Sequence, residues 1–317
     1  MQEALDVIFS MTFLVAVLRV ATPLILPALG GLVSELGGVG NIAMEGLMLA
    51  AACAGALVSA YSKNIWLGLI AGLLVSMLLA ALLAFFHLDL KADLVLSAVA
   101  MNILSSGATI FVVYLLTKDK SGTSSLVSGQ MPFLNDIIPG INDIAVIGPL
   151  LNQNILTYAA IVLTAVVATF LYRTRTGIHL RAVGENPDAA RSVGINVRQM
   201  RYLALLISGF FAGLGGVYLS MGYVKFFARD MTAGRGFIAI AAVYLGAKNP
   251  WGTFVAALAF GAADALSIQL GNLKIPTQLV QMIPYVATLI ALIVYALVQR
   301  QRAIARQRKF RQLKVQS

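Results

Sequence analysis

IWLGLIAGLLVSMLLAALLAFF, residues 65–86, is a run of 22 residues without a charged side chain. A helix needs about 20 apolar residues to cross the hydrocarbon core of a membrane. Further mostly apolar runs lie on both sides of it, at 4–21, 41–61, 94–116, 155–172, 202–224, 251–270 and 275–299. Only helices and closed barrels satisfy their backbone groups in lipid, and these runs have the length of helices. The sequence therefore predicts an all-α integral membrane protein.

The composition supports this class, and the basic residues indicate an orientation. Hydrophobic residues make up 59% of the chain and charged residues 11%, whereas a soluble domain carries about 25% charged residues. The net charge of +10 comes largely from six Arg within 173–201 and seven Lys or Arg within 299–317. Because Lys and Arg gather at the cytoplasmic ends of spans, we expect both segments in the cytoplasm. Their position beside spans disfavours the alternative that the tail binds nucleic acid.

The number of spans follows from the requirement that an even number of crossings separates these two cytoplasmic segments. Three full-length runs lie between them, so the short uncharged run 236–247 must also cross, as a short or broken helix. A second short run, 20–34, is interrupted by Pro23 and Pro27 and follows the run 4–21. Counting both short runs predicts about ten transmembrane helices with both termini inside. Eight spans with two re-entrant pieces is the alternative.

The two halves of the chain show a weak internal similarity. An offset of 206 residues aligns small residues of two runs, pairing Gly46 with Gly252, Ala50 with Ala256, Ala51 with Ala257, Gly55 with Gly261 and Ala56 with Ala262. Small residues are common in membrane helices, so chance similarity is the alternative to a duplication. The predicted topology gives both copies the same direction, which makes the repeat a parallel one.

The runs and charges divide the chain into two parts. Residues 1–299 are predicted to form one transmembrane domain, with a cytoplasmic loop at 173–201 and an extracytoplasmic loop at 118–148. Residues 300–317 form a basic cytoplasmic tail. The loop 118–148 holds three Asp against two Lys, which suits the outer face. It either meets an external partner or only connects two spans.

The sequence lacks the residue patterns of an enzyme. It has no GxxxxGK[ST] loop for a nucleotide, and its two histidines, His87 and His179, have no partner at metal-ligand spacing. A single cysteine, Cys53, allows no disulfide framework. We therefore predict no catalytic residues, no metal site and no cofactor.

Polar residues inside the apolar runs are candidates for a transport path. Because a charge at bilayer depth is costly, it normally faces a cavity or a partner. The alternatives are structural: Glu45 caps a helix start, and the polar face of residues 102–106 forms interhelical hydrogen bonds. The candidates for the path are Asn41, Glu45, Asn102, Ser105 and Asp264.

The charged segment between two apolar runs, GENPDAARSVG at 184–194, contains a short helix. Asn186 has the character of a helix cap, Pro187 suits the first position, and Asp188 suits the first turn. Ala189 and Ala190 continue the helix and Gly194 ends it. So short a helix is unstable alone, so it must dock on a partner or lie on anionic headgroups.

Three segments resemble a known family. Residues 177–196 resemble the cytoplasmic coupling loop of ABC importer permeases. The segment VGNIAMEGLM at 39–48 is similar to the N-I-G-L-E-G-M signature of their nucleoside members, although Ala43 and Met44 depart from the usual Gly-Leu. RGFIAIA at 235–241 and Leu245-Gly246 resemble a second conserved stretch. The similarity covers roughly residues 20–295, and it fits the simple-sugar and nucleoside permeases, relatives of the branched-chain amino acid permeases.

The resemblance implies the permease subunit of an ATP-driven importer in a bacterial plasma (inner) membrane, with about ten spans. A cytoplasmic ABC ATPase, an extracytoplasmic substrate-binding protein and a second, different permease would be its partners, alongside membrane lipid. This chain would be the shorter permease, and the substrate path would run between the two. Nucleosides are the expected substrate, and sugars or branched-chain amino acids are the alternatives.

The resemblance also implies which residues couple the permease to the ATPase, namely Gly184, Glu185, Asn186, Pro187, Asp188, Ala189, Ala190, Arg191 and Gly194. Ala190 is expected to face a close-packed groove on the ATPase, which alone would hydrolyse ATP. An ion-coupled secondary transporter is a further alternative, favoured only by Glu45 and Asp264 inside apolar runs.

Overall fold

The computed structural model describes residues 11–138, 148–270, 286 and 293. These residues form helices, irregular segments and two isolated β-bridges. Seven of the helices are long and apolar enough to cross a membrane, and an eighth apolar helix is shorter. The all-α membrane class is confirmed at this level. The predicted run 275–299 and the tail 300–317 lie outside the described residues, apart from two isolated positions.

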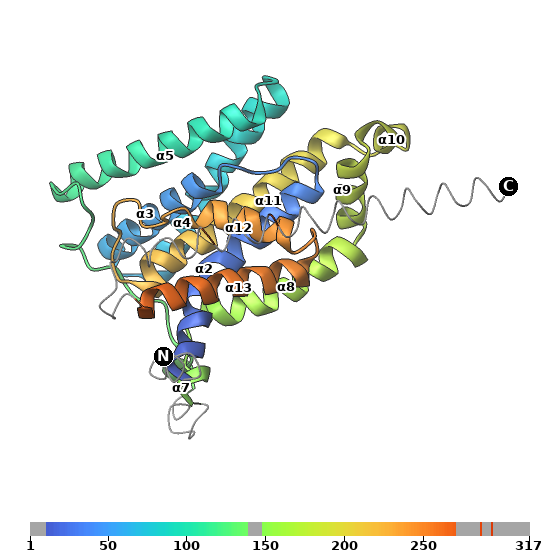
Figure 1. Ribbon diagram of the computed structural model, residues 1–317. Coiled ribbons are helices and arrows are strands. Elements are labelled where there is room, and N and C mark those ends of the chain that lie inside the picture. The colour runs from blue at the N-terminus through green and yellow to red at the C-terminus, as the bar shows by residue number, and fades with distance from the viewer. Residues whose placement is uncertain (1–10, 139–147, 271–285, 287–292, 294–317) are drawn as a thin grey trace.

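The helices follow one another along the chain from blue to red in Figure 1. They are α2 (Met11–Leu36), α3 (Met44–Ser62), α4 (Ile65–Ala84) with its π-helical continuation (Phe85–Asp89), α5 (Leu94–Thr117), α6 (Leu134–Ile137), α7 (Gly148–Leu151), α8 (Ile155–Arg173), α9 (Arg175–Glu185), α10 (Pro187–Ser192), α11 (Val197–Val217) with its π-helical continuation (Tyr218–Tyr223), α12 (Arg235–Leu245) and α13 (Pro250–Leu270).

Helix α2 corrects the predicted span count. The runs 4–21 and 20–34 were expected as two crossings, but residues 11–36 form one continuous helix that contains Pro23 and Pro27. In a membrane helix, neighbouring helices and local adjustments compensate for the hydrogen bond that a proline removes. Pro27 packs against Gly215 of α11, where an added Cβ would lie 2.9 Å from the ring. The count of ten is therefore wrong at this point by one crossing.

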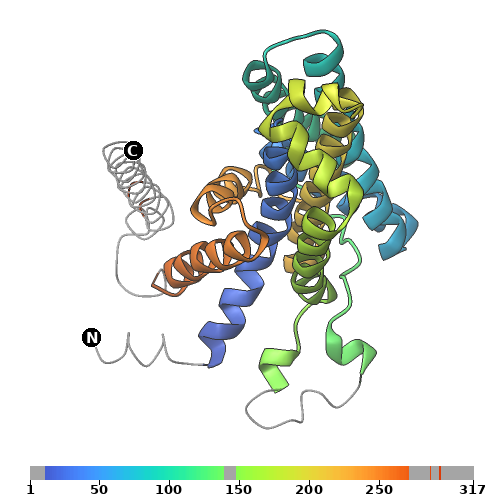
Figure 2. The ribbon, with the colours of Figure 1, turned by 90° about the vertical axis from the view of Figure 1, so that its right-hand side faces the viewer.

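The core of the protein is built around α2 and α11. Helix α2 packs on α11, α12 and α13, and α11 packs in turn on α3 and α4. Figure 2 shows α13 and α11 on different sides of α2. Gly216 of α11 lies so close to α3 that an added Cβ would overlap the carbonyl oxygen of Met48. Close backbone approach of this kind is how helices associate in lipid, where burial of apolar surface supplies little driving force.

The outer helices keep much of their apolar surface exposed. In the most apolar 18-residue stretches of α4, α5 and α8, 22–33% of the stretch is buried. In α11 with its continuation, the buried share is 78%. Exposed leucines, isoleucines and valines on these helices include Leu78, Leu96 and Val162. A soluble protein rarely leaves so much apolar surface open. These faces are suited to lipid or to a second membrane subunit.

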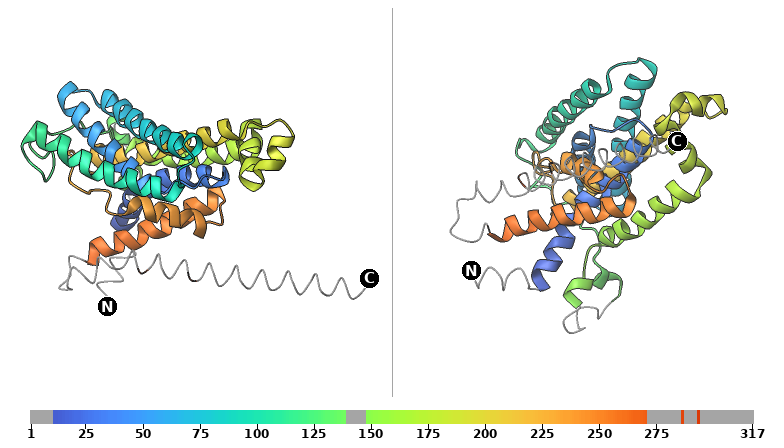
Figure 3. Two further views of the ribbon diagram at one scale, coloured as in Figure 1. Left: turned by 90° about the horizontal axis from the view of Figure 1, so that it is seen from above. Right: turned by 45° about the vertical axis from the view of Figure 1, so that its right-hand side comes forward.

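The two ends of the helix bundle differ. One end carries α9 and α10, which we call the hairpin, and it projects beyond the other helices (Figure 3). At the opposite end, the segment after α5 pairs with the segment after α11, where the Thr123 N–H donates to the Phe227 carbonyl at 2.8 Å. The predicted loop 118–148 belongs to this opposite end, although its residues 139–147 lie outside the described part.

Candidate functional site

The hairpin begins with a capped turn at the end of α8. The Thr174 hydroxyl accepts a hydrogen bond from the Gly177 N–H at 3.1 Å, so it caps the start of α9. A side chain at Gly177 would overlap the carbonyl oxygen of Phe170, so the turn requires glycine there. These two residues direct α9 away from α8.

The predicted boundaries of the short helix are confirmed. The Asn186 side chain accepts from the N–H groups of Asp188 and Ala189 at 3.1 and 3.0 Å, and Pro187 occupies the first turn. Helix α10 ends at Ser192, and Gly194 then adopts a φ of +83°. A residue other than glycine would be strained in this left-handed conformation.

Ala190 corrects the expectation that it faces a partner. It is 3% exposed and packs with Val183 and Val197 in a small cluster between the hairpin and the start of α11. A helix of six residues cannot hold its shape alone, and this cluster provides the packing it needs. The exposed residues of α10 and of the position that follows it include Asp188, Ala189, Ser192 and Val193, together with Arg191.

The other charged residues of the hairpin lie on its surface. Glu185 is exposed, and Arg191 forms an ion pair with Asp188 at 3.1 Å in which both side chains are largely exposed. A surface pair of this kind contributes about 0–1 kcal/mol at most. Charge therefore contributes little to holding the hairpin, which depends on its caps and on the Ala190 cluster.

Gly184 joins the hairpin to the central helix. A Cβ at Gly184 would overlap the carbonyl oxygen of Leu36, the last residue of α2, and would lie 3.0 Å from the Gly38 nitrogen. Gly38 itself has a φ of +74°. The backbones of α9 and of the turn after α2 are therefore in direct contact, and a movement of the hairpin reaches α2 without an intervening side chain.

We expect Gly184→Val to displace α9 from the end of α2, because backbone atoms cannot move aside as a flexible side chain does. Overpacking of this kind costs about 1–3 kcal/mol. Faster tryptic cleavage after the exposed Arg175 would report the displacement. Gly107→Val is the matched control, because an added Cβ at Gly107 has no neighbour within 4 Å. Equal cleavage of the two variants would contradict the contact.

A second polar contact fixes the start of α11 beside the hairpin. Arg198 pairs with Asp89 at 2.5 Å, and the Tyr202 hydroxyl donates a hydrogen bond to the same carboxylate. Asp89 ends the π-helical continuation of α4. The base of the hairpin is thus tied to α4 as well as to α2.

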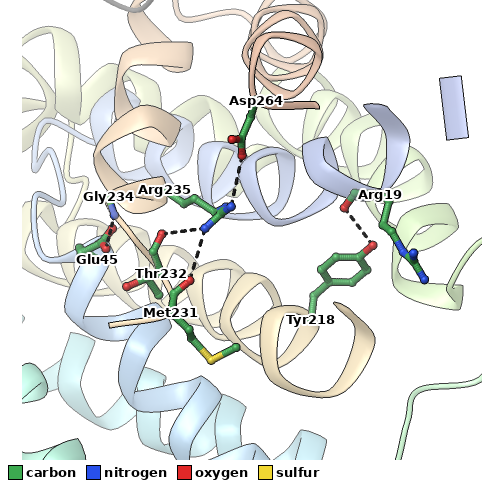
Figure 4. A network of polar contacts seen from close by, with 8 residues as sticks. All are labelled: Arg19, Glu45, Tyr218, Met231, Thr232, Gly234, Arg235 and Asp264. Atoms are coloured by element: carbon green, nitrogen blue, oxygen red, sulfur yellow. Dashed lines mark hydrogen bonds and ion pairs between the residues drawn. The ribbon is translucent and has the colours of Figure 1, made fainter. Parts of the chain in front are cut away.

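Glu45 lies beside a polar network centred on Arg235 (Figure 4). Its carboxylate accepts hydrogen bonds from the Gly234 and Gly236 N–H groups, both at 2.7 Å. These groups belong to the start of α12, where the first backbone donors have no partner within the helix. The alternative that Glu45 caps the start of a helix is therefore confirmed. The helix that it caps is α12 and not its own helix, α3.

Asp264 pairs with a residue that the sequence analysis did not select. The Arg235 guanidinium lies 3.2 Å from the Asp264 carboxylate, and both side chains are 20% exposed. Arg235 also donates to the carbonyls of Met231 and Thr232 at 3.3 and 3.4 Å. An acid inside an apolar run needs a basic partner, and this requirement could have pointed to Arg235 in the sequence. Arg235 lies at the edge of another apolar run.

Asn41, Asn102 and Ser105 surround the start of α3. The buried Asn41 side chain donates to the Ser208 hydroxyl at 2.9 Å. The Asn102 carbonyl accepts from the Gly46 N–H at 2.8 Å, and its amide donates to the Ile42 carbonyl at 3.1 Å. The interhelical hydrogen bond predicted as the alternative for Asn102 is confirmed. The Ser105 hydroxyl is buried without a partner among the described residues.

The five path candidates therefore gather around the starts of α3 and α12. Four of them hold helix ends or helix pairs in place. Phe237, in the first turn of α12 beside Gly236, is 49% exposed.

Comparisons with known proteins agree on one family. A family model described as "Branched-chain amino acid transport system / permease component" matches residues 13–292. The guanosine ABC transporter permease protein NupQ of Bacillus subtilis is 37% identical over 91% of this chain and 93% of its own. The putative glucose ABC transporter permease protein TsgC13 of Haloferax volcanii is 35% identical over 84% and 80%. The nucleoside ABC transporter permease protein NupC of Lactococcus lactis is 31% identical over 92% and 94%.

Proposed function

This chain belongs to the permease component family of branched-chain amino acid transport systems, and we propose that it is the membrane subunit of an ATP-driven importer for nucleosides. The similarity to the guanosine permease NupQ, which extends over nine-tenths of both chains, carries this proposal. The chain itself catalyses no reaction in it. A separate cytoplasmic ATPase hydrolyses ATP, and a binding protein delivers the substrate from outside.

The proposed orientation places the hairpin in the cytoplasm. Among the described residues, eight Lys or Arg lie at the hairpin end of the bundle and six at the opposite end, where Arg19 lies over the Tyr223 ring. That bias agrees with the excess of Lys and Arg on cytoplasmic loops. Helix α2 then runs inward from the outer face. The tail 300–317 joins the hairpin in the cytoplasm, and residues 1–299 form the transmembrane domain.

We expect cysteines placed at the two ends to be labelled from opposite sides of the membrane. Ser192→Cys, on the hairpin, should react with an impermeant maleimide only in inside-out vesicles. Ser124→Cys, at the opposite end, should react only in intact cells. Both positions are exposed, and the native Cys53 is buried, which keeps the background low. Reversed labelling would overturn the orientation.

The parallel repeat is part of the proposal. Helices α3 and α13 begin at Met44 and Pro250, which are 206 residues apart, the same offset that aligns their small residues. Helix α13 runs antiparallel to α2, because Lys248 lies beside Glu35 and Gly261 lies against Ala21. Helix α3 also returns toward the opposite end, where the Ser59 hydroxyl accepts from the Gly129 N–H. The equal start and direction support a duplication.

The ATPase docks on the exposed side of the hairpin, formed by Asp188, Ala189, Ser192 and Val193. Val193 is 75% exposed and offers an apolar contact on this side. When the ATPase pair closes on ATP, the hairpin moves with it. The contact of Gly184 with Leu36 passes this movement to α2, and α2 passes it to α11 and α13 through their packing.

A second, different permease packs on the exposed apolar helices, and the substrate passes between the two subunits. The start of α12 faces this path in the proposal. Because Glu45 and Arg235 hold the irregular segment before α12, that segment keeps its backbone groups satisfied at membrane depth. Short helices that begin within the membrane line substrate paths in other transporters.

The function is tested by reconstituting this chain with its ATPase, second permease and binding protein in proteoliposomes. We expect uptake of radiolabelled guanosine that requires ATP. The similarity to TsgC13 makes glucose the second candidate, so glucose is measured in parallel. Uptake of glucose alone would replace the nucleoside proposal. Uptake driven by an ion gradient with this chain alone would contradict the importer itself.

A further inference from the structure

A cavity of about 510 Å³ lies at the base of the hairpin, between α10, the start of α11 and the end of α4. Its lining is strongly basic. The residues that line it are Leu88, Arg191, Gly194, Ile195, Asn196, Val197, Arg198 and Arg201. Three of these eight residues are arginines, and no lining residue is acidic. The cavity is therefore suited to an anion.

Arg201 is the lining arginine that has no acidic partner among the described residues. Arg191 pairs with Asp188, and Arg198 pairs with Asp89, but Arg201 has no ion pair or hydrogen bond within the described chain. Its Nε is withdrawn from solvent and has no acceptor. A buried donor of a charged group without a partner costs more than about 1–3 kcal/mol. An anion in the cavity would remove this cost.

The start of α11 adds further donors to the same cavity. Asn196 caps this helix, and its side chain accepts from the Gln199 N–H at 3.1 Å. The N–H groups of the first turn otherwise have no partner within the helix, and the helix dipole favours negative charge at this end. Val197 and Arg198, which belong to this turn, line the cavity. The donors and Arg201 thus converge on one volume.

The surface beside the cavity indicates where the anion comes from. Exposed apolar side chains follow α4 along one face toward Leu88, at the spacing of three, four or seven residues that keeps them on one side of a helix. They are Leu67, Ile70, Leu74, Leu78 and Phe85. An acyl chain fits along such a face, and the basic cavity lies at its end, where a lipid headgroup would be.

We propose that this cavity binds the phosphate of an anionic phospholipid, with Arg201 as its principal contact and one acyl chain along α4. The Arg201 guanidinium donates to the phosphate oxygens, which is the geometry that guanidinium and phosphate groups favour. Basic pockets between membrane helices on the cytoplasmic side are suited to such headgroups. The tail 299–317 has no acidic side chain that could pair with Arg201.

The proposal is tested by measuring which lipids the purified importer retains. The complex is exchanged in detergent into equal amounts of phosphatidylglycerol and phosphatidylcholine, washed, and analysed for bound lipid by mass spectrometry. We expect phosphatidylglycerol to be enriched on the unaltered protein. Arg201→Gln should lower this enrichment about tenfold, the loss expected for one charge-assisted contact. Arg201→Lys keeps the positive charge but loses the paired N–H donors of the guanidinium group. It should therefore give an intermediate enrichment.

Arg175→Gln is the matched control, because it removes one exposed charge from the same hairpin and does not line the cavity. Equal enrichment in the Arg175 and Arg201 variants, or none in the unaltered protein, would overturn the proposal. Release of the lipid by millimolar inorganic phosphate would assign the cavity to free phosphate. Loss of the ATPase from Arg201→Gln, with lipid retention unchanged, would assign Arg201 to a carboxylate of the ATPase.

A comparison at two salt concentrations tests the proposal independently of the Arg201 variants. If Arg201→Gln does not fold, the unaltered protein is compared at low and high salt, because screening weakens a headgroup contact of this kind. Enrichment that is the same at both salt concentrations would then contradict the proposal. None of these measurements uses transport, so a failure of the nucleoside assignment leaves the lipid result unaffected.

Discussion

Val193→Asp is expected to lower ATP-dependent uptake about tenfold or more while the permease stays folded in the membrane. Val193 is 75% exposed beside α10, so the substitution disturbs no packing in the free subunit. In the complex, the new carboxylate would lie in an apolar contact with the ATPase. Burial of an unpaired charge costs several kcal/mol, and 1.4 kcal/mol already corresponds to about tenfold in binding. Copurification of the ATPase with the permease measures this loss directly.

Val127→Asp is the matched control for Val193→Asp. Val127 is 67% exposed and lies at the opposite end of the bundle, so the same change of charge there should leave the ATPase bound. Ala190→Glu should behave differently from both, because Ala190 is buried between the hairpin and the start of α11 and its substitution damages the fold. If Val193→Asp retained the ATPase and full uptake, the exposed side of the hairpin would not be the docking surface.

Glu45→Ala is expected to lower the free energy of unfolding by about 3 kcal/mol. The substitution removes two charge-assisted hydrogen bonds, to Gly234 and Gly236, and leaves both donors partly buried without an acceptor. Hydrogen bonds to charged groups contribute about 1.5–3 kcal/mol each, and part of this is regained if water enters. Denaturant titration in detergent measures the change, and Glu45→Gln should lose less because its amide oxygen still accepts.

Glu185→Ala serves as the control for Glu45, because Glu185 is exposed on the hairpin and its loss should change stability by no more than about 0.5 kcal/mol. The same experiment separates the two roles considered for Glu45. A variant that keeps its stability but loses uptake would show that the carboxylate acts on the substrate path and not as the cap of α12.

The sequence predicted the elements whose cause is local. The cap at Asn186, the proline after it and the glycine at 194 determine α10 through neighbouring backbone groups, and all three are confirmed. The long apolar runs were found for the same reason. In contrast, the two expected N-terminal spans are one helix, because packing against α11 decides whether Pro23 and Pro27 interrupt it. A single run of sequence does not contain that information.

The polar contacts show the same difference between what neighbouring residues determine and what distant segments determine. Glu45 and Asp264 were selected because charges are rare at such depth, but their partners Gly234 and Arg235 lie far away in the sequence. Spacing along one helix cannot reveal a contact between distant segments. Ala190 was assigned to the outer face for a related reason. Two consecutive alanines indicate close packing, but only the positions of Val183 and Val197 show on which side that packing occurs.

The small cluster of Val183, Ala190 and Val197 separates the stability of the hairpin from its recognition of a partner. The side chains that maintain its shape point inward, and those proposed to meet the ATPase point outward. The outer residues are therefore free to diverge without unfolding the element that presents them. A permease built in this way is modular. Exchanging only Asp188, Ala189, Ser192 and Val193 for their counterparts should transfer it from one ATPase to another.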